Sequence, residues 1–338
     1  MHMSDALISP QVSAAMWVAS LGTAAYSIRV LKNQETEPPA ALAGVLGAFV
    51  FAAQMINFSI PGTGSSGHLG GALLLSILLG PHLAFLCMAA ILLIQALFFA
   101  DGGILAYGCN VFNLGFYTCF IAYPYVYVPL AERNTKGSTL WAAVLAGILG
   151  LQMGAFSVVI QTILSGKTEI PFSLFTMLMQ PIHLAIGLVE GLVTASIVAY
   201  ILKTERTLLQ RGTTASPTYN SLGRLTTVFA ILALFTGGFF SWFASENPDG
   251  LEWALEHATG STELGADSKI HRLFASVQDA TALLPDYSLP SQYTEPYTSS
   301  LATYGGTSIA GILGAGISFL FVLIVSNIIR RKVKAHRS

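Results

Sequence analysis

Long apolar stretches separated by short polar ones run through the whole chain. A helix that crosses a bilayer needs about 20 apolar residues, and nine stretches reach or approach that length. They are 10–31, 40–57, 68–81, 82–100, 104–130, 139–164, 174–202, 225–244 and 305–329. The third is short and follows a glycine-rich loop, a combination tolerated at membrane depth only where protein or a cavity surrounds it. The pattern predicts an all-α integral membrane protein.

The polar stretches divide the chain into two parts. The first seven predicted spans fill residues 1–205, and a polar linker, 206–223, follows them. Residues 224–338 contain the last two spans, which flank a stretch, about 245–303, with nine acidic residues. We call residues 245–303 the polar segment. We therefore expect a seven-helix N-terminal bundle, followed by two C-terminal transmembrane helices that flank a small domain outside the membrane.

Composition supports the membrane assignment and excludes other classes. Hydrophobic residues make up 53% of the 338, charged residues only 10%, and the mean hydropathy is +0.64. A soluble globular chain carries about 25% charged residues. The net charge of −1 provides no basic surface for nucleic acid. The three cysteines lie in apolar runs without a CxxC pair, so we interpret them as small buried residues.

The distribution of positive charge predicts the orientation. With the N-terminus outside, nine spans leave three basic residues outside, namely Lys167, Lys269 and Arg272. The inside then holds the other thirteen of the 16: Arg29, Lys32, Arg133, Lys136, Lys203, Arg206, Arg211, Arg224, Arg330, Arg331, Lys332, Lys334 and Arg337. Because cytoplasmic loops are enriched in Lys and Arg, this asymmetry predicts an outer N-terminus and an inner C-terminus. The polar segment is then extracytoplasmic, and residues 1, 2 and 68 lie on one side.

The first two residues, Met1-His2, form a chelator that needs no fold. The α-amine, the deprotonated His2 amide nitrogen and a His2 ring nitrogen can close fused five- and six-membered rings around one metal ion. His68 could complete a square of four nitrogens, a geometry that suits Ni(II) and Cu(II) and disfavours Zn(II). We expect Met1 to remain as the mature N-terminus, since no basic region and no cleavage site of a signal peptide are apparent. A histidine near the start by chance is the competing interpretation.

Several short polar side chains could support these ligands. A metal-bound imidazole usually donates its other N–H to a neighbouring group, which fixes the ring. Asp5 is close enough in sequence to do this for His2. Asn57, Ser59, Thr63, Ser65 and Ser66 are the candidates for His68. The sequence does not choose among them.

Glu190 and His183 lie deep in the seventh predicted span, two helical turns apart on nearly the same face. An ionisable residue in a membrane span is costly and raises a functional hypothesis by default. The options are support for the metal site, a polar lock between helices, or simple hydrogen bonding of Glu190 to neighbouring backbone.

Four other polar residues carry weaker signals. His82 follows Pro81 at a predicted cytoplasmic turn and is interpreted as structural. Asp101 marks an outer turn and could attract cations. His257 and His271 of the polar segment could form a weak capture site, although solvated histidines explain them as well.

Three motifs occur together in residues 1–205: Met1-His2-Met3-Ser4-Asp5, Gly67-His68-Leu69-Gly70-Gly71 and the stretch His183 to Gly191. In this combination the N-terminal part resembles the nickel/cobalt substrate-binding membrane subunits of energy-coupling factor (ECF) transporters, the NikM/CbiM group. The rest resembles the NikN-type partner subunit, because Pro248-Asp249-Gly250-Leu251-Glu252 matches its PDGLE signature and Leu284-Pro285-Asp286-Tyr287 fits its later part. The chain is thus similar to a natural fusion of the two.

The resemblance implies a non-enzymatic subunit for uptake of Ni(II), or alternatively Co(II). It makes the Met1 amine, the His2 amide and ring, and His68 the metal ligands. The expected location is the bacterial cytoplasmic (inner) membrane. The expected partners are a NikQ/CbiQ-like coupling subunit and NikO/CbiO-like ATPases, because the chain has no GxxxxGK[ST] loop of its own.

Two functions from other classes compete with metal uptake. A membrane metallohydrolase could use His68, His183 and Glu190 around zinc, but no HExxH motif is present. A metal-sensing receptor could use the polar segment as its sensor. The tail after Arg330 is too short for a signalling domain, and we therefore favour uptake.

Overall fold

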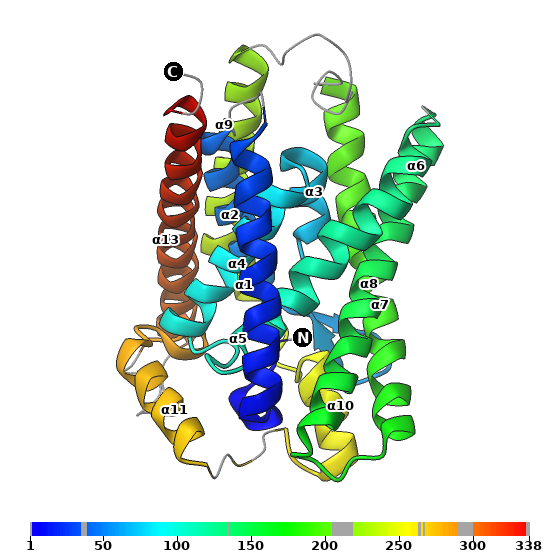
Figure 1. Cartoon of the computed structure of the whole chain (residues 1–338), viewed down its shortest axis with the longest axis vertical. Coiled ribbons are helices and arrows are strands. Elements are labelled where there is room, and N and C mark those ends of the chain that lie inside the picture. The colour runs from blue at the N-terminus through cyan, green and yellow to red at the C-terminus, as the bar shows by residue number, and fades with distance from the viewer. Residues whose placement is uncertain are drawn as a thin grey trace.

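The structure is a computed structural model that describes residues 2–34, 39–133, 135–204, 219–262, 265, 268–289 and 300–335. Its long helices lie roughly along one axis and form a bundle (Figure 1). They are α1 (Pro10–Lys32), α2 (Ala40–Gln54), α4 (Pro81–Phe98), α7 (Lys136–Ser165), α8 (Phe172–Thr204), α9 (Tyr219–Gly238) and α13 (Ser300–Ala335). Ser9 caps α1 by accepting a hydrogen bond from the Val12 N–H, and proline follows it at the first helical position.

Six helices in the described part of the chain are long and apolar enough to cross a membrane. One of them, Tyr107–Ala131, comprises α5 (Tyr107–Val111), wide π-helical turns over Phe112–Phe116 and Thr118–Tyr127, and α6 (Val128–Ala131). Pro124 lies within these turns, and it has no N–H to donate to a regular helix. α2 and the stretch Leu222–Gly238 are shorter apolar helices. The predicted class, a mostly helical multi-pass membrane protein, is confirmed.

The third predicted span is wrong at its start. Residues 68–81 were expected to be helical, but the structure has a hairpin of β1 (Phe58–Ile60) and β2 (Ser65–Gly67), an extended loop, and then α3 (Ala72–Leu79). Gly71 adopts a φ of +78°, a left-handed conformation in which Val50 would also clash with a Cβ. The helix therefore begins only at Ala72, and His68 lies in the loop before it.

The polar segment forms two short helices, α10 (Gly250–Thr259) and α11 (Lys269–Thr281), which sequence patterning did not predict. Asp249 caps α10 by accepting hydrogen bonds from the backbone N–H groups of Leu251 and Glu252. Both helices lie at one end of the bundle, opposite to the end at which α13 finishes (Figure 1). An isolated bridge between Ser66 and Asp249 joins β2 to the start of α10.

The last helix, α13, lies at one edge of the bundle and packs against α2 and α9 (Figure 1). Gly311 lies so close to the Gly237 backbone that a Cβ would clash, and Gly314 lies against Phe51 in the same way. Small residues allow such close approach of membrane helices. Gly311 and Gly314 therefore serve packing within the chain.

Residues 2–9 fold back into the bundle as an arm with one 3-10 turn, Asp5–Leu7. Met3, Leu7 and Ile8 are fully buried. The Met3 backbone pairs with the Asn110 side chain, with an N–H donated to Oδ1 at 2.8 Å and a carbonyl that accepts from Nδ2 at 3.1 Å. His271 of α11 donates from Nε2 to the Ile8 carbonyl at 2.9 Å. The arm is thus held by both the bundle and the polar segment, which fixes the place of His2.

Candidate metal-binding site

His2 and His68 lie face to face, with ring centroids 4.8 Å apart and planes inclined by 12°. Each side chain is only 7% exposed. In both rings Nε2 is buried and has no hydrogen-bond partner among the described residues. Leaving such atoms unpaired is costly, so two of them on stacked rings mark a candidate place for a ligand.

Asp101 holds the His2 ring from the loop after α4. The Nδ1–H of His2 donates to Oδ1 of Asp101 at 2.7 Å, and the hydroxyl of Tyr287 donates to Oδ2. Burial raises the pKa of this carboxyl, but His2 and the two hydrogen bonds outweigh burial and hold the pKa at about 2. Asp101 is therefore ionised throughout the physiological range. A carboxylate that fixes an imidazole is typical of metal sites.

Asp5, which we expected to orient the His2 ring, has a different contact. Its Oδ1 accepts the backbone N–H of Ala106 at 2.9 Å and so anchors the arm. Burial raises the pKa of this carboxyl. The nearest acid in the sequence is thus not the partner of the ring, because the loop after α4 folds over the arm.

The His68 ring is set by its own loop. Its Nδ1–H donates to the Leu69 carbonyl at 3.0 Å, which leaves the lone pair on Nε2. Burial, reinforced by the neighbouring His2, lowers the pKa of His68 to about 3. The imidazole is therefore neutral at physiological pH, which is the form that binds metals.

Glu190 fixes the loop that carries His68. Its two carboxylate oxygens accept the backbone N–H groups of Gly70 and Gly71, each at 2.9 Å. Glu190 is 3% exposed and lies in the middle of α8. Of the expected roles, hydrogen bonding to backbone is the one observed, and it also positions the loop two residues after His68.

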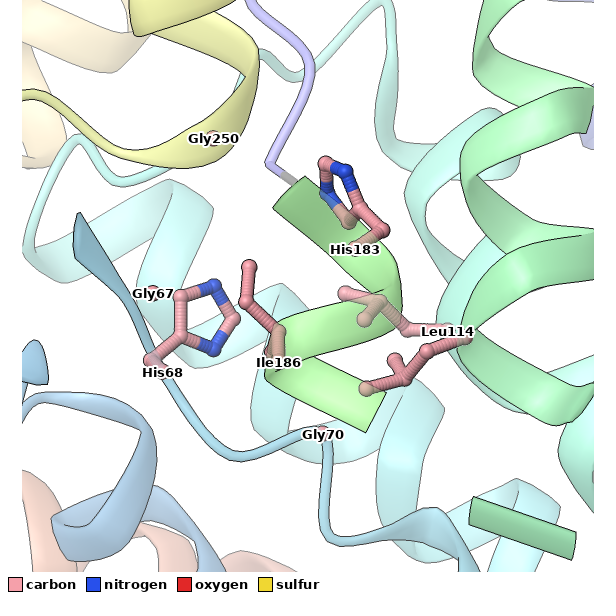
Figure 2. A pocket seen from close by; sticks show the side chains of 8 residues that line it. Gly67, His68, Gly70, Leu114, His183, Ile186 and Gly250 are labelled. Atoms are coloured by element: carbon pink, nitrogen blue, oxygen red, sulfur yellow. The ribbon is translucent and has the colours of Figure 1, made fainter. Parts of the chain in front are cut away.

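His183 faces the same interior as His68. Its Nδ1–H donates to the Met179 carbonyl at 2.8 Å, and Nε2 is buried without a partner among the described residues. Figure 2 shows His68 and His183 on the wall of one cavity, with Gly250 of α10 beside them. The cavity measures about 10 Å³, room for roughly one water-sized group. A Cβ on Gly250 would lie 3.0 Å from the His183 ring, which explains a glycine in this signature.

The polar residues before His68 contact the polar segment instead of the imidazole. The Asn57 carbonyl accepts the Ser245 N–H at 2.7 Å, and the Ser59 hydroxyl bonds that of Ser245 at 2.7 Å. The Ser66 hydroxyl donates to the Asn247 carbonyl at 2.8 Å. Our expectation that Asn57, Ser59 or Ser66 fixes the His68 ring is therefore replaced by a role in attaching the polar segment.

Met1 lies outside the described residues. His68 stacks on His2 and shares a cavity with His183. Sequence reasoning missed Asp101 as the partner of His2, and it missed Asn110 and Tyr287. A buried amide within an apolar span could have revealed Asn110. Among the described residues, no three His, Cys, Asp or Glu side chains converge as a metal cluster.

Two family descriptions match the chain. "Cobalt uptake substrate-specific transmembrane region" covers residues 2–208, and the PDGLE domain covers residues 223–331. A solved structure of a truncated transition metal transporter is 28% identical, with a TM-score of 0.54, and covers 60% of this chain and 99% of its own. The transport fold thus extends over the N-terminal part.

Fused proteins are similar over nearly the whole length. The putative fused nickel transport protein NikMN of Archaeoglobus fulgidus is 33% identical, covering 94% of this chain and 95% of its own. The fused nickel transport protein NikMN of Rhodobacter capsulatus is 27% identical, covering 95% and 99%. The cobalt transport protein CbiM of Sorangium cellulosum is 31% identical over 62% and 95%. The chain therefore belongs to the CbiM/NikMN family of nickel and cobalt transport components, as a multi-pass, non-enzymatic transporter subunit.

Proposed function

We propose that this chain is the substrate-binding membrane component of an ATP-driven ECF-type transporter that takes up Ni(II). The observation that carries the proposal is the stacked and buried pair of His2 and His68, in which Nε2 of His68 has no partner among the described residues. The fused relatives named as nickel transport proteins support the choice of ion.

The ligands in this proposal are the Met1 amine, the His2 amide nitrogen, a His2 ring nitrogen and Nε2 of His68. A six-membered chelate ring through the His2 amide requires Nδ1, which the structure places on Asp101. The imidazole must therefore turn about its Cβ–Cγ bond when the chelate closes. Asp101 can then accept an N–H from the turned ring or stabilise the cation through space.

The strong in-plane field of an amine, an amidate and two imidazoles favours a low-spin square-planar ion. We expect Ni(II) to bind best, Co(II) second and Zn(II) poorly, with Cu(II) also bound in vitro. Co(II) as the physiological substrate is the alternative, since CbiM relatives are named as cobalt transport proteins. Magnetic measurement separates the geometries, because octahedral Ni(II) with oxygen ligands is paramagnetic and square-planar Ni(II) is not.

Family members work with other transporter components. We infer that a NikQ/CbiQ-like coupling subunit and NikO/CbiO-like ATPases supply the energy, and that residues 1–205 and 224–338 are the NikM-like and NikN-like parts. We place the protein in the bacterial inner membrane with Met1 and the polar segment outside, because of the positive charge asymmetry. Cysteines at Ser4 and Ser216 should react with a membrane-impermeant reagent from opposite sides.

One added residue tests the site. An alanine before Met1 turns the amine into a peptide nitrogen and shifts His2 to the third position, while His68 stays fixed. Binding of nickel should be abolished in the full chain, whereas folding and membrane insertion should be retained. A site made only of side chains would bind nickel equally well with the added alanine. Native affinity of the extended chain would therefore exclude the Met1 amine and the His2 amide as ligands.

A further inference from the structure

A polar chamber of about 290 Å³ lies between the N-terminal arm, the loop after α4 and the polar segment. Its wall includes five carboxylates and one imidazole, contributed by both halves of the chain: His2, Asp5, Asp101, Asp249, Glu252 and Asp286. None of the described residues that line it is lysine or arginine. The chamber therefore combines negative charge with one of the proposed metal ligands.

Two of the five carboxylates have a role in capping α10. Oδ1 of Asp249 and Oε2 of Glu252 form the capping box of α10. Two buried atoms on the wall remain without a hydrogen-bond partner among the described residues, Oδ2 of Asp5 and Nε2 of His2. The His2 side chain is more than nine-tenths buried. Capping thus explains why acids stand at these positions in α10, but not why acids from three other segments face them.

Carboxylates gathered around one chamber repel one another unless a cation offsets their charge. Burial raises the pKa of Asp5 and of Glu252, which shows the cost of ionising them there. A divalent cation in the chamber would lower that cost. Six waters occupy about 180 Å³ at the density of liquid water, so the chamber has room for a divalent ion with its hydration shell.

We propose that this chamber captures the hydrated divalent cation as an outer-sphere complex, before the nitrogen ligands replace its waters. The proposal rests on the proposed function, because His2 forms the inner wall of the chamber. Asp101 contacts both the chamber and His2, so the ion would pass from carboxylates to nitrogen without leaving the protein. The polar segment then acts directly in substrate capture through Glu252 and Asp286.

This role predicts a kinetic effect. Nickel exchanges its bound water slowly, so its association rate is the outer-sphere occupancy multiplied by the rate of water loss. Negative charge raises the occupancy at low ionic strength, and salt removes that gain, since the Debye length falls from about 30 Å at 0.01 M to about 3 Å at 1 M. The carboxylates should therefore change the association rate far more than the dissociation rate.

The test uses two isosteric double variants of the full chain in detergent, each of which removes two negative charges. Glu252→Gln with Asp286→Asn neutralises the chamber. Glutamine retains the capping box, and asparagine tolerates the left-handed φ of 45° at residue 286. The control variant, Glu256→Gln with Asp279→Asn, removes the same charge from positions outside the chamber.

Nickel association is followed by rapid mixing and quenching into a metallochromic chelator. The chelator reports the free nickel, so the readout does not depend on which protein atoms bind the metal. We expect the chamber variant to associate about fivefold more slowly at 0.01 M ionic strength and less than about twofold more slowly at 1 M. Its final stoichiometry and dissociation rate should equal those of the unaltered chain. The association rate of the control variant should differ from that of the unaltered chain by less than about twofold.

If both variants associate equally slowly, the effect comes from overall charge. If the chamber variant associates at the unaltered rate, Glu252 and Asp286 have no role in capture. Either result would overturn the capture role. Failure of the proposed function would give a different result. Either the unaltered chain would bind no nickel, or the alanine-extended chain would bind nickel with native affinity.

Discussion

Three histidines of the N-terminal arm and bundle, His2, His68 and His183, differ from the two of the polar segment in how their second ring nitrogen is used. In His2, His68 and His183 one ring nitrogen donates to a carboxylate or a backbone carbonyl, while Nε2 is buried with no partner among the described residues. Three such atoms in one region represent hydrogen-bonding capacity that the described part of the fold leaves open.

In the polar segment, one imidazole is buried with both ring nitrogens hydrogen-bonded, and the other is exposed to solvent. His271 is 1% exposed, and its two nitrogens bond Ser268 and the Ile8 carbonyl. His257 is exposed, and its Nδ1–H donates to the Trp253 carbonyl at 2.9 Å. Burial alone therefore does not distinguish a ligand from a structural histidine. The distinguishing feature is a buried nitrogen that the surrounding chain does not satisfy.

The largest effect should come from replacing His68, matched against His271. His68→Ala removes a proposed ligand and should lower nickel affinity at least a hundredfold, since even the groups that orient ligands contribute 10- to 100-fold. His271→Ala should lower the melting temperature, because it removes bonds to α11 and the arm, yet leave affinity within about fivefold. Calorimetry of binding and unfolding measures both. Similar losses of affinity in the two variants would erase the distinction between the two regions.

The second effect concerns protons. Burial holds the pKa of His68 at about 3, so this ring stays neutral and does not compete for protons near neutrality. The amine, with an ordinary pKa of about 7.7–8.0, and the amide must each release a proton to bind. Nickel affinity should therefore fall about 100-fold from pH 7 to pH 6. An isothermal titration with one proton released, or none, would contradict a chelate through the backbone.

The apolar pattern sufficed to predict most helices, because a segment in lipid must pair its backbone N–H and C=O groups internally, as a helix does. It failed at residues 68–71, where Gly71 has a left-handed φ and Glu190 binds the loop from a distant helix. No local signal shows that a carboxylate 119 residues away accepts the Gly71 N–H. The helix start was therefore beyond sequence reasoning.

The site divides in the same way. Chelate chemistry singled out His2 and His68, which the structure stacks on each other, and charge asymmetry predicts that they lie on one side of the membrane. The partner of His2 could not be named, since Asp5 is near in sequence and Asp101 is near in space. Likewise Ser59 and Ser66 suit an imidazole chemically, but they bond the polar segment instead. Supporting groups depend on tertiary contacts, whereas chelate rings depend on covalent geometry.

Asp101→Asn should have the third largest effect. The amide keeps the shape but loses the charge that binds the His2 ring and accepts from Tyr287. We expect affinity for nickel to fall 10- to 100-fold, as for other groups that orient metal ligands. Asp279→Asn, at an exposed position of α11, is the matched control. Equal affinities of both variants in competition with a chelator would remove Asp101 from the site.

A smaller effect is expected from Glu190→Gln. Glutamine has one oxygen where two accept the N–H groups of Gly70 and Gly71, and its NH₂ group faces a donor. One buried N–H left unpaired costs about 1–3 kcal/mol of stability. The loop that carries His68 should also loosen, with affinity falling about three- to tenfold. Thermal unfolding in detergent and nickel titration measure the two losses, and a melting temperature equal to that of the unaltered chain would show that the two bonds do not hold the loop.

The smallest effect belongs to His257, the residue that tests whether an exposed imidazole contributes anything. Its ring lies on Trp253 with centroids 4.1 Å apart, and its Nδ1–H is already donated to the backbone. The remaining nitrogen competes with water and has no fixed second ligand, so a metal gains little there. His257→Ala should therefore change nickel affinity and uptake by less than about twofold. A loss near that of His68→Ala would mean that the polar segment supplies a ligand, and the contrast between the two groups of histidines would then fail.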